Sequence, residues 1–276
     1  MGFNKRKNID AVLYWLMAGS LVVVGIILLC ILGYILTSAA GYLNLRFITT
    51  GIFPMIVTTV YVVLVSLAIA LPVGIITAVF LHEYAKDSRA IRLLRLAIET
   101  LAGIPSILYG LFGLLLFCRF FKLGQSIIAG AFTLSIMILP VIIRTVEESL
   151  KTIPDSFREA SLSLGATKLQ TVLYIILPEA LPGILTAGIL AIGRVAGESA
   201  PVLLTVGIAQ NLPKSIFDSG RTLTIHLYYL TKEAINPEDF GIAFATAGTL
   251  VILVIVINTA AKVITYTFRK KLGGGL

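Results

Sequence analysis

Six long apolar runs constrain this chain more than any other feature of its sequence. Each has about 18 residues or more, enough for a helix rising about 1.5 Å per residue to cross a hydrocarbon core about 30 Å thick. The runs are 11–37, 55–81, 101–118, 126–143, 183–206 and 241–261. Hydrophobic residues make up 58% of the 276 residues and charged ones 13%, which excludes an ordinary soluble domain. We expect an all-α, polytopic membrane protein with six transmembrane helices.

The first apolar run has two interpretations. It follows Lys5, Arg6 and Lys7, and small residues at 37–40 come after it, as in a secretory signal peptide. Its apolar length is about twice that of a signal-peptide core, which favours a retained first span. The expected divisions of the chain are an N-terminal span with an external loop at 1–50, a transmembrane domain at 51–266 and a cytoplasmic tail at 267–276.

The distribution of Lys and Arg predicts the orientation, because these residues collect in the cytoplasmic connections of membrane proteins. With the N-terminus inside, fourteen of the 22 Lys and Arg residues lie in inner segments and six lie in outer ones. Both termini are therefore expected on the cytoplasmic side. The same asymmetry accounts for the net charge of +8 without a nucleic-acid partner.

The longest inner connection, 144–182, contains a predicted helical hairpin. Asp155 can cap the start of one helix, and Gly165 can end it. Thr167, with Gln170 three residues on, has the capping-box pattern of a second helix. Pattern alone leaves two interpretations open: an element gripped by a cytoplasmic partner, or an amphipathic hairpin resting on the lipid surface. We expect the hairpin to occupy residues 155–178.

One arginine lies deep within an apolar run. Arg194 is eleven residues into the fifth run, which is about 16 Å at the helical rise and near the middle of the hydrocarbon core. An arginine there costs about 2.5 to 3.5 kcal/mol on insertion scales, so it needs a partner. Glu198, four residues on, is the partner that helical spacing offers. The two form either a structural ion pair or an anion relay, in which Arg194 binds an oxyanion when Glu198 releases it.

Two other features of the spans carry weaker signals. Arg144 lies at the inner end of the fourth span, directly after the apolar run. Pattern alone favours a cytoplasmic anchor whose side chain reaches the membrane–water interface. Gly103 and Pro105 should bend or unwind the third run near its start. Such a break either lines a cavity or is a simple packing kink.

The sequence contains no catalytic motif and no metal-binding pattern. It has no G-x-x-x-x-G-K-[ST] phosphate loop, no H-E-x-x-H and no G-x-S-x-G. His82, His226, Cys30 and Cys118 do not have metal-ligand spacing. We expect neither an enzyme nor a metal site, so any ATP hydrolysis must come from another subunit.

The predicted hairpin resembles the coupling motif of ABC-importer permeases, E-A-A, three residues, G, nine residues, I-x-L-P. The matching residues are Glu159, Ala160, Ser161, Gly165, Ile175, Leu177 and Pro178, with serine as the one departure. Further segments resemble the PstA-type permease of phosphate importers: 101–113, which reads LAGIPSILYGLFG, 139–168, which contains VIIRTVEE, and 181–205, which contains GRVAGE. The resemblance implies a type I, MetI-like permease fold in the inner membrane.

This resemblance also implies roles and partners. Glu159, Ala160, Ser161 and Gly165 would dock on an ATPase subunit, and Arg144 and Arg194 would take part in transport. The partners would be a PstC-type permease, two PstB-type ATPase subunits that bind the ATP, and an external PstS-type phosphate-binding protein. The chain itself would hold no cofactor.

Three alternatives stay open. The first is a permease for another oxyanion or a polar solute, such as molybdate, sulfate or an amino acid. The second is a secondary transporter or channel that needs no ATPase, which the coupling motif disfavours. A membrane enzyme ranks last, because only Arg194 and Glu198 offer polar chemistry at one membrane depth.

Overall fold

The structure, a computed structural model, describes residues 2–86 and 88–272, and these residues form helices without any strand. The long helices are α1 (Gly2–Ala40), α2 (Phe53–Val79), α3 (Arg89–Gly103), α5 (Ile127–Lys151), α9 (Leu181–Gly197) and α12 (Pro237–Leu272). The shorter ones are α4 (Ser106–Gly113), α6 (Asp155–Ser163), α7 (Lys168–Thr171), α8 (Leu177–Glu179), α10 (Ala200–Thr205) and α11 (Leu223–Glu233). Four π-helical segments are η1 (Phe47–Gly51), η2 (Phe80–Tyr84), η3 (Leu114–Phe120) and η4 (Val172–Ile176). The expected all-α class is confirmed.

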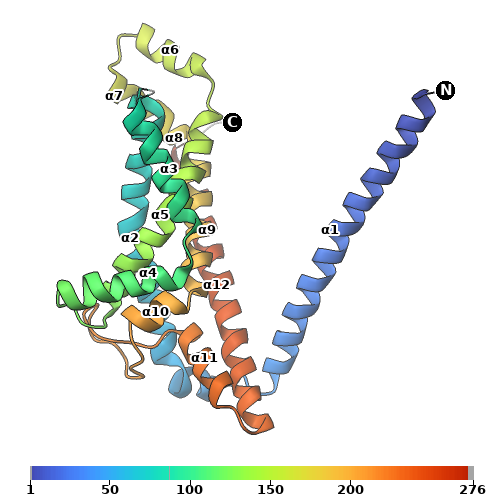
Figure 1. Ribbon diagram of the computed structural model, residues 1–276, viewed down its shortest axis with the longest axis vertical. Helices are drawn as coiled ribbons and strands as arrows, with labels where there is room; N and C mark the ends of the chain where they lie inside the picture. The colour runs from blue at the N-terminus through green and yellow to red at the C-terminus, as the bar shows by residue number, and fades with distance from the viewer. Residues whose placement is uncertain (1, 87, 273–276) are drawn as a thin grey trace.

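The core of the bundle forms around α5, which packs against α2 on one side and α9 on another (Figure 1). Ile138, Ile142 and Val146 on α5 are wholly buried. Gly74 of α2 allows a close approach, because a Cβ atom there would lie 2.5 Å from Cγ2 of Ile142. A helix enclosed in this way must be apolar around most of its circumference, which explains why this run carries so few charges before its inner end.

The six predicted runs correspond to four long helices and two bent pairs. Four helices are long and apolar enough to cross a membrane: Val12–Ala40, Phe53–Tyr84, Ile127–Lys151 and Pro237–Val263. The pair Arg89–Gly103 and Ser106–Phe120 is bent by 102°, and the pair Lys168–Glu179 and Leu181–Gly197 by 63°. Counting each pair as one span gives six.

The predicted break near Gly103 and Pro105 is confirmed. Ile104 and Pro105 separate α3 from α4, and Figure 1 shows α4 lying across the bundle, whereas α3 runs along it. The hydroxyl of Tyr109 donates a hydrogen bond of 2.7 Å to the carbonyl of Leu101, across the break. The same carbonyl accepts a bond of 3.2 Å from the Ile104 amide, so the Tyr109 hydroxyl is a second donor that ties α4 to the end of α3.

The fifth run is not one continuous helix, so the expectation of a single helix over 183–206 is wrong. Helix α9 ends at Gly197, Glu198 has an extended backbone with ψ 138°, and α10 starts at Ala200. The reason is Pro201, because its ring would clash with the carbonyl of Gly197 in an unbroken helix. In the first turn of α10, the missing N–H of Pro201 costs nothing.

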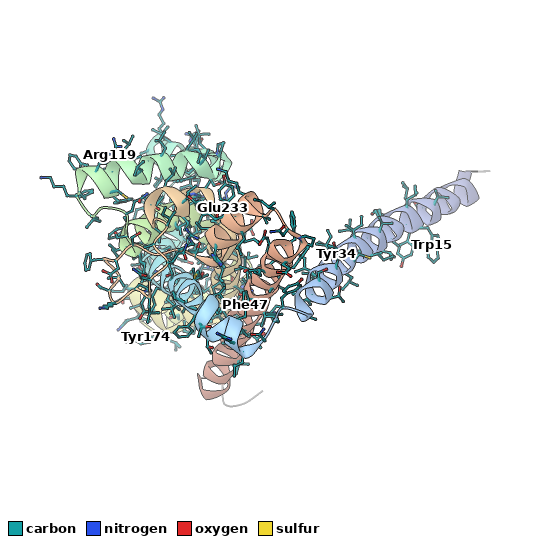
Figure 2. All side chains as sticks on the ribbon, turned by 90° about the horizontal axis from the view of Figure 1, so that it is seen from below. Trp15, Tyr34, Phe47, Arg119, Tyr174 and Glu233 are labelled. Atoms are coloured by element: carbon teal, nitrogen blue, oxygen red, sulfur yellow. The ribbon has the colours of Figure 1, made fainter. Side chains whose placement is uncertain are left out.

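Helix α1 extends away from the bundle, with Tyr34 beside α12 and Trp15 beyond it (Figure 2). The rings of Tyr34 and Phe244 meet edge to face with their centroids 5.4 Å apart. Most large apolar side chains from Val12 to Leu36 are exposed. Lipid or another chain must cover them.

The start of α1 and the end of α12 lie at the same end of the molecule as α6 (Figure 1). Helix α12 continues to Leu272, so the first part of the predicted tail is helical. Residues 273–276 of that tail lie outside the described residues.

Candidate functional site

The hairpin lies beyond the end of the bundle and is formed by α6 and α7 (Figure 1). Gly165 has φ +85°, a left-handed conformation that glycine adopts without a steric penalty, and it follows the end of α6. Thr167 and Gln170 form the predicted capping box: the Thr167 hydroxyl accepts from the Gln170 amide, and the Gln170 side chain accepts from the Thr167 amide. The prediction of a second helix start at Thr167 is confirmed.

The expectation that Asp155 caps α6 is wrong. Pro154 is the N-cap residue and makes no side-chain cap, while Asp155 is the first residue of the helix. The Asp155 carboxylate instead accepts a hydrogen bond of 3.2 Å from Nη1 of Arg158. An acidic residue in the first turn still interacts favourably with the positive end of the helix dipole.

The coupling-motif residues divide into exposed and buried ones. Glu159 and Ala160 are exposed, so a partner can reach them. Ser161 is buried, and its hydroxyl lies 2.9 Å from the hydroxyl of Thr171. The serine that departs from the family motif therefore joins α6 to α7, a contact that sequence reasoning missed.

Arg194 and Glu198 lie together at the break between α9 and α10. Arg194 is in the last turn of α9, and its Nε is 3.8 Å from Oε1 of Glu198. This is an ion pair without a hydrogen bond, since charge-assisted hydrogen bonds measure about 2.7 to 2.9 Å. The arginine side chain remains 38% exposed and the glutamate 17%. Thr224 of α11 donates a hydrogen bond of 2.9 Å to the Glu198 carbonyl and so fixes the break.

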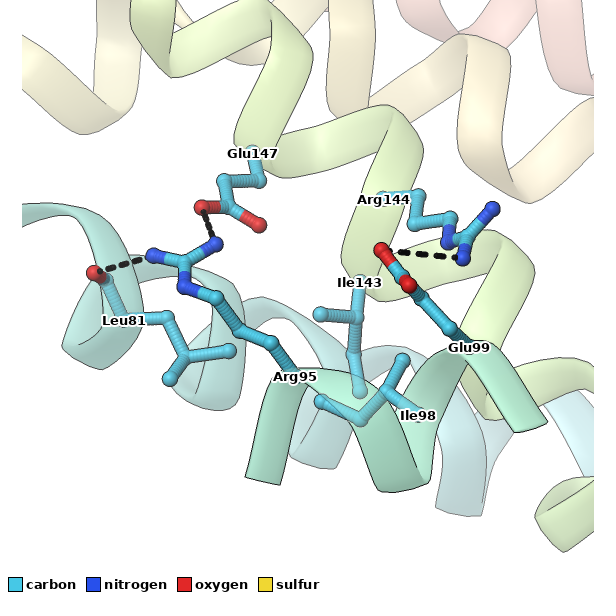
Figure 3. A pocket seen from close by; sticks show the side chains of 7 residues that line it. All are labelled: Leu81, Arg95, Ile98, Glu99, Ile143, Arg144 and Glu147. Atoms are coloured by element: carbon cyan, nitrogen blue, oxygen red, sulfur yellow. Dashed lines mark hydrogen bonds and ion pairs between the residues drawn. The ribbon is translucent and has the colours of Figure 1, made fainter. Parts of the chain in front are cut away.

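Arg144 pairs with a residue that sequence reasoning missed. Its Nη2 lies 3.5 Å from Oε1 of Glu99 on α3, as Figure 3 shows. Both side chains are largely accessible, at 48% and 61% exposed. Glu147, one turn beyond Arg144, is buried and instead pairs with Arg95. Arg95 also donates a hydrogen bond of 3.1 Å to the carbonyl of Leu81 in η2.

The signal that could have found Glu99 is the charge pattern of α3. Arg92, Arg95 and Glu99 recur at spacings of three and four, which places them on one face of a helix. Most of this segment lies between the second and third apolar runs, where hydropathy offers its charged face no partner. In the structure Arg95 and Glu99 pair with Glu147 and Arg144 of α5.

The two arginines lie at different depths. Gly183 of α9 is level with Ser149 of α5, because a Cβ atom on the glycine would lie 2.1 Å from Cβ of the serine. From that level, Arg144 is five residues along α5 and Arg194 eleven residues along α9. The helical rise then places the first about 8 Å and the second about 16 Å from the hairpin end of the bundle.

Within the described residues, no group of three or more His, Cys, Asp and Glu side chains could hold a metal ion. Burial, together with the nearby Arg221, lowers the pKa of His226 to about 4. Its imidazole is therefore neutral at neutral pH. The candidate site consists of arginines with carboxylate partners, a chemistry that suits oxyanions.

The chain matches a family model and several curated relatives. The model for the binding-protein-dependent transport system inner membrane component matches residues 70–273. The probable ABC transporter permease protein YqgI of Bacillus subtilis (strain 168) is 33% identical, over 91% of this chain and 92% of that protein. The phosphate transport system permease protein PstA 1 of Mycobacterium tuberculosis (strain CDC 1551 / Oshkosh) is 37% identical, over 80% of this chain and 72% of that protein.

Solved structures share the fold. An inward-facing conformation of the MetNI methionine ABC transporter matches with a TM-score of 0.62 and 25% identity, over 79% of this chain and 94% of that one. A chain of a bacterial alginate ABC transporter in complex with its periplasmic protein gives a TM-score of 0.66, over 99% of this chain and 98% of that one. That match is 14% identical, so it speaks only for the fold.

Proposed function

This chain belongs to the family of binding-protein-dependent transport system inner membrane components, and we propose that it is the PstA-type permease of an ATP-driven importer of inorganic phosphate. Its spans make it a multi-pass inner-membrane protein and a transport subunit. The relatives that carry phosphate in their names support this cargo over other oxyanions or polar solutes. The coupling motif in α6 and α7 favours an importer over a secondary transporter or channel.

The partners that we propose follow from this assignment. ATP would be bound and hydrolysed by two PstB-type subunits, one of which would dock at the exposed Glu159, Ala160 and Gly165, while the buried Ser161 holds α6 on α7. A PstC-type permease would complete the pathway, and a PstS-type phosphate-binding protein would deliver the anion from outside. The hairpin, 155–178, would then face the cytoplasm. The start of α1 and the end of α12 lie at the same end of the molecule as α6, which supports cytoplasmic termini.

The observation that carries the proposal is the difference between loose and tight ion pairs. Arg194 and Arg144 contact their carboxylates at 3.8 and 3.5 Å, and neither pair makes a hydrogen bond. Arg158 and Glu83, by contrast, are 2.7 Å apart and nearly buried. A loosely held guanidinium keeps its donors available, so an oxyanion can replace the carboxylate. We propose that the anion passes from Arg194, with Glu198 as its counter-ion, to Arg144 nearer the cytoplasm.

Uptake of radiolabelled phosphate tests this function. Cells lacking the chain should recover uptake at low external phosphate when it is restored, and excess sulfate, molybdate or amino acids should not compete. Membrane amounts of the chain and its ATPase are measured in parallel. If the complex assembles and the chain restores no phosphate uptake, the cargo assignment is wrong.

The pair of Arg144 and Glu99 gives a sharper prediction. We expect Arg144→Gln to lower the initial uptake rate at least about tenfold, the equivalent of 1.4 kcal/mol, because an anion station is lost. Glu99→Gln should stay within about fivefold of wild type, since an exposed pair contributes about 1 kcal/mol at most. Equal losses in both variants would mean that the pair holds α3 on α5 and does not receive the anion.

A further inference from the structure

A cation with little solvent exposure lies at the base of the hairpin. Arg158 directly precedes Glu159, and its side chain is 17% exposed. Its Nη2 donates a hydrogen bond of 2.7 Å, and its Nε one of 3.1 Å, to Oε1 of Glu83 in η2. The Glu83 side chain is 7% exposed. Exposed ion pairs contribute little, but separating a buried pair leaves an uncompensated charge behind.

The same guanidinium also reaches the inner end of α5. It donates hydrogen bonds to the carbonyls of Leu150 and Ile153, at 3.4 and 3.0 Å. These carbonyls lie at or just past the end of α5, so the guanidinium adds side-chain hydrogen bonds where the regular helical pattern stops. Hydrogen bonding to Glu83 raises the pKa of Arg158, so this guanidinium stays charged at any physiological pH. One side chain thus connects the inner end of α2, through η2, with the end of α5 and with α6.

The backbone alone provides a weaker connection. Helix α5 ends at Lys151, and three non-helical residues separate it from α6. A hairpin joined only by such a link could tilt without moving the helix before it. Helix α5 carries Arg144 and packs against α9, which carries Arg194. Any displacement of α6 that reaches α5 therefore reaches both arginines.

We propose that Arg158 and Glu83 form the mechanical joint through which displacement of α6 is transmitted to α2 and α5. The inference rests on the proposed function in that it takes α6 as the ATPase docking element. Arg158 is a positioning residue here, since it contacts neither the anion nor ATP. The joint couples ATP hydrolysis to phosphate transport, so its loss should uncouple the two activities rather than abolish both.

The test uses the whole purified transporter, with both permeases and the ATPase subunits, in liposomes. Arg158→Gln and Glu83→Gln should each keep the subunits together and at least half of the ATP hydrolysis, while phosphate moved per ATP falls at least tenfold. The double variant should be no worse than either single one. Arg158→Lys should retain part of the wild-type phosphate moved per ATP, because lysine keeps the positive charge. The retention should be incomplete, because lysine lacks the several N–H donors of the guanidinium. The matched control is Asp155→Asn, which removes an exposed carboxylate from the same guanidinium and should change nothing.

A second readout does not depend on the cargo. Cys30 and Cys118 are replaced, and Glu148→Cys places a single thiol on the exposed side of α5. Its labelling should change between ATP-free and vanadate-trapped wild type, and should not change in Arg158→Gln. If wild type moves no phosphate but this difference appears, the cargo is wrong and the joint stands. The joint would be overturned if both glutamine variants kept the wild-type ratio of phosphate to ATP and the wild-type difference in labelling between the two states. Parallel loss of transport and hydrolysis through dissociated subunits would also overturn it.

Discussion

Arg194→Ala should reduce phosphate uptake to below about 1% of wild type in cells that depend on this chain, a loss of about 2.7 kcal/mol in transition-state free energy. The variant removes the guanidinium, about 16 Å into the bundle, that we propose as the first station of the anion. It also leaves Glu198 without its cation, and a carboxylate there repels the cargo. The measurement is the initial uptake rate at low external phosphate, with membrane levels of the chain and the ATPase determined in the same cells.

Three further variants test whether the loss of uptake in Arg194→Ala comes from the missing guanidinium. Arg119→Ala removes an exposed arginine outside the proposed path and should transport normally. Arg194→Lys keeps the charge but not the bidentate fork, so it should retain a small part of the activity. Glu198→Gln should retain more than Arg194→Ala, since a neutral side chain does not repel the anion. Normal uptake by Arg194→Ala, in normal amounts, would exclude the proposed path.

The spans were predictable because hydrophobic length is a local property. A run of apolar residues defines a membrane helix without knowledge of its neighbours, and the break at Ile104 was visible in Gly103 and Pro105. The break after Gly197 was missed, although Pro201 marks it. The apolar residues on both sides of Pro201 predicted one continuous span, because hydropathy carries no information about the direction of the backbone.

The candidate site was predictable only where its contacts are local. Glu198 was found from its spacing of four after Arg194, although the two meet at a helix end rather than along a continuous helix face. Glu99 and Arg144 come from different helices, and their contact depends on how α3 packs on α5. Glu83 and Arg158 are separated still further in sequence, so no short pattern joins them. Long-range pairs of this kind need the fold.

The turn of the hairpin offers the other prediction with a large effect: Gly165→Val should lower phosphate uptake at least about tenfold, equal to 1.4 kcal/mol. Gly165 has φ +85°, and an L-residue there costs about 1 to 2 kcal/mol, more when branched at Cβ. A Cβ atom at this position would meet no heavy atom within 4 Å, so any loss of uptake must come from the backbone conformation and not from steric crowding. The rearranged turn should move Glu159 out of its docking position on the ATPase, so less ATPase should co-purify with the chain.

Gly165→Asn is the matched control, because asparagine tolerates the left-handed conformation at helix ends better than other residues with a side chain. It adds a side chain of similar size at the same exposed position, so a loss confined to the valine variant must come from φ. If both variants lose the ATPase equally, the ATPase cannot accept any side chain at position 165, and the loss does not come from the backbone conformation. If the valine variant transports normally, the geometry of this turn does not position the coupling element, and Glu159 must be held by α6 and its contacts with α7 alone.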